Sequence, residues 1–105
     1  IKTIVKPALE TLEEFTNDNL IFDIIFIDAD KNNYKNYYNK VIQMTKQDGL
    51  IIIDNVLWHG EVADEKNNEK FTKIIRDFNT YVKNDKRTQQ IILPLGDCLT
   101  ICSKL

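Results

Sequence analysis

The chain has 105 residues, of which 43% are hydrophobic and 29% are charged, and its formal net charge is −2. This composition excludes disordered and collagen-like chains, and the length suffices for one hydrophobic core but not two, so we expect a single domain over residues 1–105. Acidic and basic residues are interspersed, no apolar run approaches the ~20 residues of a membrane span, and the start lacks the pattern of a signal peptide. We therefore expect a cytoplasmic protein that binds small molecules, with no nucleic-acid or membrane partner.

Strand-like and helix-like segments alternate along the chain. In order they are the end of a strand at 1–5, a helix from Pro7 to about residue 16, a strand at 20–27, a helix at 33–46 that Gly49 stops, a strand at 50–53, a loop at 56–67, a helix around 71–82, and strands near 88–93 and 98–103. Helical spacing of apolar residues predicts the helices, and uninterrupted apolar runs predict strands covered on both faces. This order is typical of an α/β fold, here a Rossmann-like, mostly parallel sheet with an antiparallel last strand.

Two carboxylates and an amide follow the two apolar strands. Asp28 comes directly after the strand at 20–27, and Asp54 and Asn55 follow the strand at 50–53. If these strands are adjacent and parallel they lie about 4.8 Å apart, so the three side chains converge at one sheet edge. Such an oxygen set suits Mg²⁺, Mn²⁺ or Ca²⁺. From spacing alone, a helix cap at Asp28 and an Asx turn at Asp54 and Asn55 are the more frequent roles.

Other polar and aromatic residues lie close to these three in the sequence. Lys31 follows Asp28 by three residues. An amine beside a bound dication loses its proton readily enough to act as a general base. The alternative is a lysine that is simply solvated. Asp30 either accepts hydrogen bonds from a ligand amine or caps the next helix. Trp58 and His59 lie in the loop after the second strand, where a flat substrate would be held, although a core-covering aromatic and a surface histidine are the simpler roles.

Tyrosine, cysteine and turn residues have mainly structural interpretations. Tyr34, Tyr37 and Tyr38 lie on the helix at 33–46 and are expected to form a core face first and a binding surface second. Cys98 and Cys102 are four residues apart in a predicted strand, about 13 Å at ~3.3 Å per residue, which is too far for a disulfide. Asp97 is predicted only as a turn residue.

Three segments together resemble one known family. Residues 22–38 (FDIIFIDADKNNYKNYY), 49–64 (GLIIIDNVLWHGEVAD) and 93–104 (LPLGDCLTICSK) are similar to the second half of the cation-dependent O-methyltransferases, which include caffeoyl-CoA and catechol O-methyltransferases. The resemblance covers nearly the whole chain. It implies a methyltransferase fold, S-adenosylmethionine and a divalent cation as cofactors, and methyl transfer to one oxygen of a vicinal dihydroxy-aromatic acceptor.

The resemblance also implies individual roles. Asp28, Asp54 and Asn55 are implied as ligands of Mg²⁺ (or Mn²⁺ or Ca²⁺), and Lys31 as the catalytic base. The residues implied at S-adenosylmethionine are Asp28, Asp30 and Tyr37. The residues implied in the substrate loop are Trp58 and His59.

Two departures from the family pattern shape the expectations. Cys98 stands where the family has a second glycine, so a residue with a Cβ must adopt a backbone suited to glycine. The glycine-rich loop and the acidic residue that build most of the family's S-adenosylmethionine site are also lacking, and the chain starts at Ile1 rather than Met. We therefore expect the carboxyl-terminal portion of an O-methyltransferase domain, with little activity by itself. In the family, the first strand of the sheet lies beside the strand that corresponds to 20–27, and this chain lacks that first strand. The resemblance therefore implies a free edge at 20–27, and we expect a homodimer or another association through that edge.

Two other functions compete with methyl transfer. A Mg-nucleotide-binding α/β domain would also end a strand in Asp, but it requires a GxxxxGK[ST] loop, which the sequence lacks. A non-catalytic assembly or regulatory module derived from a methyltransferase would keep the fold and lose cation binding.

Overall fold

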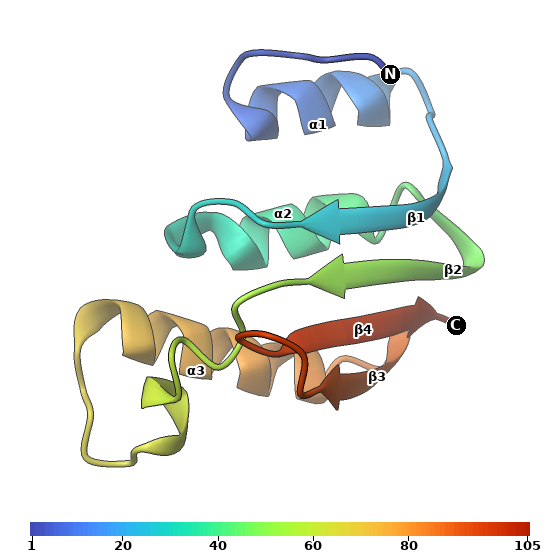
Figure 1. The fold of residues 1–105 in the computed structure, drawn as a ribbon. Helices are drawn as coiled ribbons and strands as arrows, with labels where there is room; N and C mark the ends of the chain where they lie inside the picture. The colour runs from blue at the N-terminus through green and yellow to red at the C-terminus, as the bar shows by residue number, and fades with distance from the viewer.

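Four strands form one mixed sheet in the computed structural model, which describes residues 1–105 (Figure 1). The strand order is β1-β2-β4-β3, with bounds β1 (Phe22–Ile27), β2 (Thr45–Ile53), β3 (Thr88–Leu93) and β4 (Leu99–Lys104). β1 pairs with β2 in parallel, and β4 is antiparallel to both β2 and β3. Three strands therefore share one direction and the last strand runs against them, which confirms the predicted α/β fold with an antiparallel last strand.

Three helices accompany the sheet: α1 (Ala8–Asn17), α2 (Tyr34–Val41) and α3 (Lys70–Lys83), with short 3-10 turns η1 (Lys31–Asn33) and η2 (Glu61–Ala63). α2 and α3 lie against one face of the sheet (Figure 1), and their apolar stripes meet alternate strand residues in a single core. Ile51 and Ile53 of β2 are fully buried there beside Phe78 and Val82 of α3. None of the helices is long and apolar enough to cross a membrane.

The first residues of the chain differ from the prediction. Residues 1–5 form no strand, and Ile1 and Val5 are exposed. An apolar run becomes a strand only when a neighbouring strand satisfies its backbone groups, and no strand of the sheet pairs with this segment.

The second helix also ends earlier than predicted. α2 stops at Val41 instead of continuing to residue 46, and Gly49 lies inside β2 instead of ending a helix. Ile42 and Met44 are each only 2% exposed, so the apolar spacing continues beyond the last helical turn. The Thr45 hydroxyl donates to the Val41 carbonyl at 2.7 Å, which fixes the passage from helix to strand.

Gly49 is required by a close approach of the backbone. The register moves from Phe22 opposite Thr45 to Ile24 opposite Leu50, so β2 bulges between these pairs. A Cβ on Gly49 would lie 2.8 Å from the Lys46 carbonyl oxygen and 2.9 Å from the Asp23 carbonyl oxygen.

We predict that Gly49→Ala lowers the free energy of unfolding by about 1–3 kcal/mol, because two backbone oxygens must move to admit the methyl group. Urea unfolding followed by circular dichroism measures this. Gln47→Ala, at an exposed position of the same bulge, should change stability by less than about 0.5 kcal/mol. Equal stability of the two variants would contradict the steric argument.

β1 is covered on one face only, which corrects the prediction of burial on both faces. Ile24 and Phe26 are 60% and 58% exposed, whereas Ile27 is 5% exposed and part of the core. The register places Phe26 level with Ile52, and Ile52 level with Ile101 of β4. An apolar stripe therefore crosses the sheet on the face away from α2 and α3. The outer edge of β1 pairs with no other strand, as predicted.

Both thiols are free, in agreement with the predicted absence of a disulfide. Cys102 is buried in the core, and burial raises the pKa of its thiol to about 11, so it stays protonated. Cys98 lies just before β4 rather than within it. Its φ of 64° is left-handed, which confirms that this position has the backbone that glycine adopts most easily.

Candidate active site

Three segments meet at the carboxyl-terminal edge of the sheet: the residues after β1, the loop after β2, and the turn between β3 and β4 (Figure 1). The Asp54 amide donates to the Ile27 carbonyl at 3.0 Å, so β1 and β2 end side by side. This edge is where open α/β sheets bind ligands. All eight residues predicted to act in the site follow β1 or β2 in sequence.

The Lys31 amine lies between two of the predicted cation ligands. Its Nζ is 3.0 Å from Oδ1 of Asn55 and 3.5 Å from Oδ1 of Asp28, and it also donates to the hydroxyl of Tyr34. The Lys31 side chain is only 11% exposed, while that of Asp28 is 52% exposed. The structure thus unites Asp28, Lys31 and Asn55, and excludes the alternative of a freely solvated lysine.

Asp54 and Asn55 form an irregular segment directly after β2. Oδ1 of Asp54 accepts the amide hydrogen of Asn55 at 2.7 Å, and the Asp54 carbonyl accepts the Tyr34 hydroxyl at 2.9 Å. Asn55 has a left-handed φ of 59°, which asparagine tolerates better than most residues. The Asp54 bond reaches the next residue rather than the backbone two residues on, so the Asx turn expected as the structural alternative is wrong. The Asn55 side chain instead contacts Lys31.

The donor chemistry of this edge fits a hard cation. The side-chain oxygens of Asp28 and Asn55 already share one positive charge, the Lys31 ammonium, and the remaining carboxylate oxygen of Asp54 accepts no hydrogen bond from the protein. The chain has no cluster of three His, Cys, Asp or Glu side chains, because this set pairs two carboxylates with an amide. Asp28 bonds Lys31 and does not cap the following helical turn.

Asp30 and Tyr37 form a second polar pair beside this group. The Tyr37 hydroxyl donates to one carboxylate oxygen of Asp30, and the side-chain amide of Asn33 donates to the other. These hydrogen bonds lower the pKa of Asp30. Burial and the Asp30 carboxylate raise the pKa of Tyr37 to about 12. Asp30 makes no side-chain cap to the backbone, so the cap expected there is wrong. A mostly apolar cavity of about 270 Å³ between α1 and β1 reaches Tyr37 and Asp28.

Trp58 and His59 lie in a strained loop. Both have left-handed backbones, with φ of 51° and 56°, which is unusual for large side chains. Their ring centroids are 5.4 Å apart, and the Trp58 ring also lies 6.0 Å from that of Phe71. Neither side chain hydrogen-bonds to Asp28 or Lys31, so these two residues share the edge with the polar group without joining its network.

Two residues outside the predicted set hold this loop. Oδ1 of Asp97 accepts the His59 amide hydrogen at 2.7 Å, and the Asp97 carbonyl accepts that of Leu57 at 3.2 Å. The Asn79 side chain donates to the Val56 carbonyl at 2.7 Å. The sequence pattern indicates Asp97 only as a turn residue and indicates no role for Asn79, because no local signal predicts hydrogen bonds between residues 38 and 23 positions apart.

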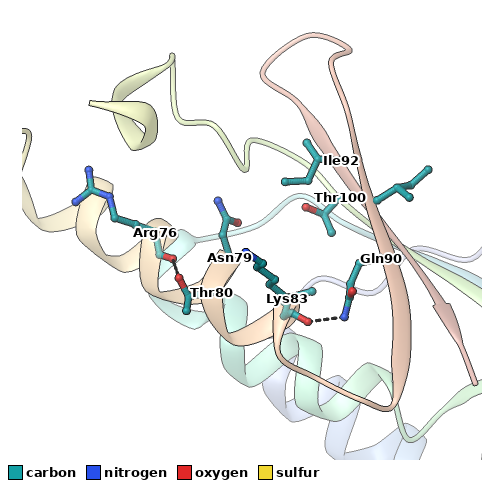
Figure 2. Close-up of a pocket in the computed structure, with 9 residues that line it drawn as sticks. Arg76, Asn79, Thr80, Lys83, Gln90, Ile92 and Thr100 are labelled. Carbon is teal, nitrogen blue, oxygen red and sulfur yellow. Dashed lines mark hydrogen bonds between the residues drawn. The ribbon is translucent and has the colours of Figure 1, made fainter. Parts of the chain in front are cut away.

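Another cavity, of about 280 Å³, lies between α3 and the strands β3 and β4 (Figure 2). Asn79, Thr80 and Lys83 line it from the helix, and Gln90 and Ile92 line it from β3. None of the predicted site residues reaches it. The largest group of predicted residues therefore remains at the carboxyl-terminal sheet edge.

Comparisons with known proteins agree with this architecture. The O-methyltransferase family model matches residues 1–105. The chain is 38% identical over 107 residues to a caffeoyl-CoA O-methyltransferase of Eucalyptus globulus and 37% identical over 105 residues to one of Nicotiana tabacum, covering 94% of this chain and 44% of each relative.

Solved structures give the same result. An O-methyltransferase from Bacillus cereus, crystallised in complex with SAH, superposes with a TM-score of 0.78 at 30% identity over 93% of this chain and 48% of that one. The chain spans about half the length of the relatives it matches. With a family model that covers every residue and relatives above 30% identity, the chain belongs to the O-methyltransferase family.

Proposed function

We propose that this chain is the carboxyl-terminal portion of an S-adenosylmethionine-dependent O-methyltransferase that requires a divalent cation and methylates a vicinal dihydroxy-aromatic acceptor. The observation that carries the proposal is the Lys31 amine, which lies within 3.5 Å of Asp28 Oδ1 and 3.0 Å of Asn55 Oδ1 at the ends of two parallel strands. A base and an oxygen ligand set are thereby in direct contact. That arrangement suits proton removal from a hydroxyl group held at the same place.

The relatives support the reaction class. The tobacco and eucalyptus proteins are named caffeoyl-CoA O-methyltransferases, and the Bacillus cereus structure contains SAH, the demethylated form of the methyl donor. The Asp30–Tyr37 pair is the proposed contact with S-adenosylmethionine, because an ionised carboxylate is a suitable acceptor for the donor's amino group.

The residues of the chain divide the chemistry between them. Asp28, Asp54 and Asn55 would hold the cation, which when bound favours the ionised acceptor hydroxyl, while S-adenosylmethionine supplies the methyl group. Nζ of Lys31, in its neutral amine form, accepts the hydroxyl proton as the new carbon–oxygen bond forms and the carbon–sulfur bond breaks, which leaves the methylated acceptor, S-adenosylhomocysteine and the Lys31 ammonium. Trp58 and His59 flank the aromatic ring of the acceptor. Fixing these groups at one edge contributes mainly through orientation.

The test is methyl transfer by the full-length protein from labelled S-adenosylmethionine to catechol, with and without Mg²⁺. We expect turnover that EDTA abolishes and that added Mg²⁺ or Mn²⁺ restores, whereas phenol, which has one hydroxyl, is a poor acceptor. The isolated 105-residue chain should turn over little or not at all. Full activity in EDTA would contradict the cation requirement, and no Mn²⁺ binding with no turnover would favour a non-catalytic assembly module.

We further propose that the free edge of β1 pairs with a second copy when the 105-residue chain is alone. An unpaired strand edge beside exposed Ile24 and Phe26 is prone to association. Light scattering should give twice the chain mass of 12.3 kDa. Ile24→Lys should shift the chain towards the monomer, whereas Gln47→Lys, at an exposed site on β2, should not. A stable monomer of the unsubstituted chain would contradict this prediction.

A further inference from the structure

The Tyr34 hydroxyl connects the Lys31 amine to the end of β2. Tyr34 is 1% exposed, and its ring packs edge-on against Phe78 with centroids 5.5 Å apart. Its hydroxyl contacts the Lys31 amine on one side and the Asp54 carbonyl, at 2.9 Å, on the other. A buried hydroxyl with both partners in place is a rigid connector, because losing either bond leaves a buried polar group unpaired.

The chemistry of the three partners fixes the direction of each bond. A carbonyl oxygen only accepts, so the single phenolic hydrogen of Tyr34 points to Asp54. Lys31 must then be the donor towards Tyr34, and it donates a second hydrogen to Oδ1 of Asn55 at 3.0 Å. Two of the three substituent positions on Nζ are therefore occupied, and the third lies towards Asp28, at 3.5 Å. Nζ also lies 4.4 Å from the centre of the Tyr34 ring, which further restrains it.

We propose that Tyr34 is a positioning residue for the methyl-transfer reaction: its hydroxyl holds the Lys31 amine so that the remaining position on Nζ, 3.5 Å from Asp28, faces the side where the acceptor hydroxyl binds. This inference rests on the function proposed above. Tyr34 acts through Lys31 and through the Asp54 carbonyl, and it touches neither the acceptor nor the methyl group.

The same helix provides a matched control. Tyr38 is 0% exposed, its hydroxyl lies 3.1 Å from that of Thr88, and its ring also packs edge-on against Phe78, with centroids 6.0 Å apart. Tyr34→Phe and Tyr38→Phe therefore remove the same buried hydroxyl group from the same helix. Only the first removes a partner of Lys31.

The test measures kcat and KM for catechol in the full-length protein, the Mn²⁺ dissociation constant by electron paramagnetic resonance, and the NMR signals of the Lys31 ε-methylene group. Tyr34→Phe should lower kcat by about 10- to 100-fold, the scale of a catalytic group displaced by about 1 Å, with less than about a threefold change in KM. The two ε-hydrogens of Lys31, distinct in the unsubstituted protein, should become equivalent. Tyr38→Phe should retain the distinct signals and a kcat within about twofold of the unsubstituted protein, even if both variants lose similar thermal stability.

The outcomes separate the two proposals. An unchanged Lys31 signal in Tyr34→Phe, or equal losses of kcat in both variants, would overturn the positioning role while leaving the methyltransferase proposal intact. If the unsubstituted protein neither binds Mn²⁺ nor methylates catechol, the proposed function fails, and the role of Tyr34 in that reaction fails with it even when the Lys31 signal depends on Tyr34.

Discussion

Replacing Lys31 with methionine should slow methyl transfer by about 10²–10⁴-fold while leaving divalent-cation binding at least as tight as in the unsubstituted protein. The first effect follows from the loss of the only amine that contacts the ligand oxygens. Cation binding should not weaken, because the Lys31 ammonium contacts Oδ1 of Asn55 and Oδ1 of Asp28. An incoming cation must compete with Lys31 for these two oxygens. Removing a positive charge 3.0 and 3.5 Å from these atoms removes repulsion towards a dication.

Isothermal titration with Mg²⁺ and labelled methyl transfer to catechol measure the two effects. Lys35→Met is the matched control, because Lys35 lies on α2, carries the same charge and stacks on Tyr81 at 4.3 Å rather than on the site. It should leave both quantities within about twofold. Weaker Mg²⁺ binding in Lys31→Met would show that the lysine supports the cation site instead of competing with it, and near-normal turnover would remove it from the reaction.

Asp54→Asn should weaken Mn²⁺ binding by at least about 10²-fold and reduce turnover at limiting cation accordingly. Even residues that only orient metal ligands cost 10- to 100-fold in affinity when replaced, so a direct ligand should cost no less. The substitution keeps the side-chain shape, and an asparagine carbonyl oxygen still accepts the Asn55 amide hydrogen that Asp54 accepts at 2.7 Å. Fold stability should therefore change little, which separates a cation ligand from a residue that only stabilises the backbone after β2.

Electron paramagnetic resonance of free Mn²⁺ measures the affinity directly. Asp23→Asn provides the control, since Asp23 lies near the opposite end of β1 with a side chain 84% exposed. It removes the same charge far from the carboxyl-terminal edge and should leave the affinity unchanged. If Asp54→Asn binds Mn²⁺ normally but unfolds more easily, Asp54 has only a structural role.

Patterns within single elements predicted most of the fold. The apolar runs at β1 and β2, the spacing along α3 and the turn before β4 are local signals, and β1 pairs with β2 in parallel as predicted. The meeting of Asp28 with Asn55 around Lys31 follows in turn, because parallel strands end at the same edge.

The features that the sequence did not predict depend on tertiary contacts. Helical spacing continues through Ile42 and Met44, which are buried after α2 has ended, so periodicity alone extends the helix too far. The supports of the site are also non-local. Asn79 reaches Val56 and Asp97 reaches His59 across the fold, and no spacing rule connects such pairs. Tyr34 lies on the apolar face that the helical spacing predicts as core. The spacing therefore does not predict the hydrogen bonds that its hydroxyl makes.

The position of the Lys31 ammonium among the carboxyl-edge oxygens bears on the order of folding and of the proposed cation binding. Zinc fingers stay unfolded until metal arrives, because nothing else neutralises their ligands. Here a side chain of the chain itself takes up that charge, at 3.5 Å from Asp28. Under the proposed function, we therefore expect the chain to reach its folded shape without the ion and to bind the ion afterwards.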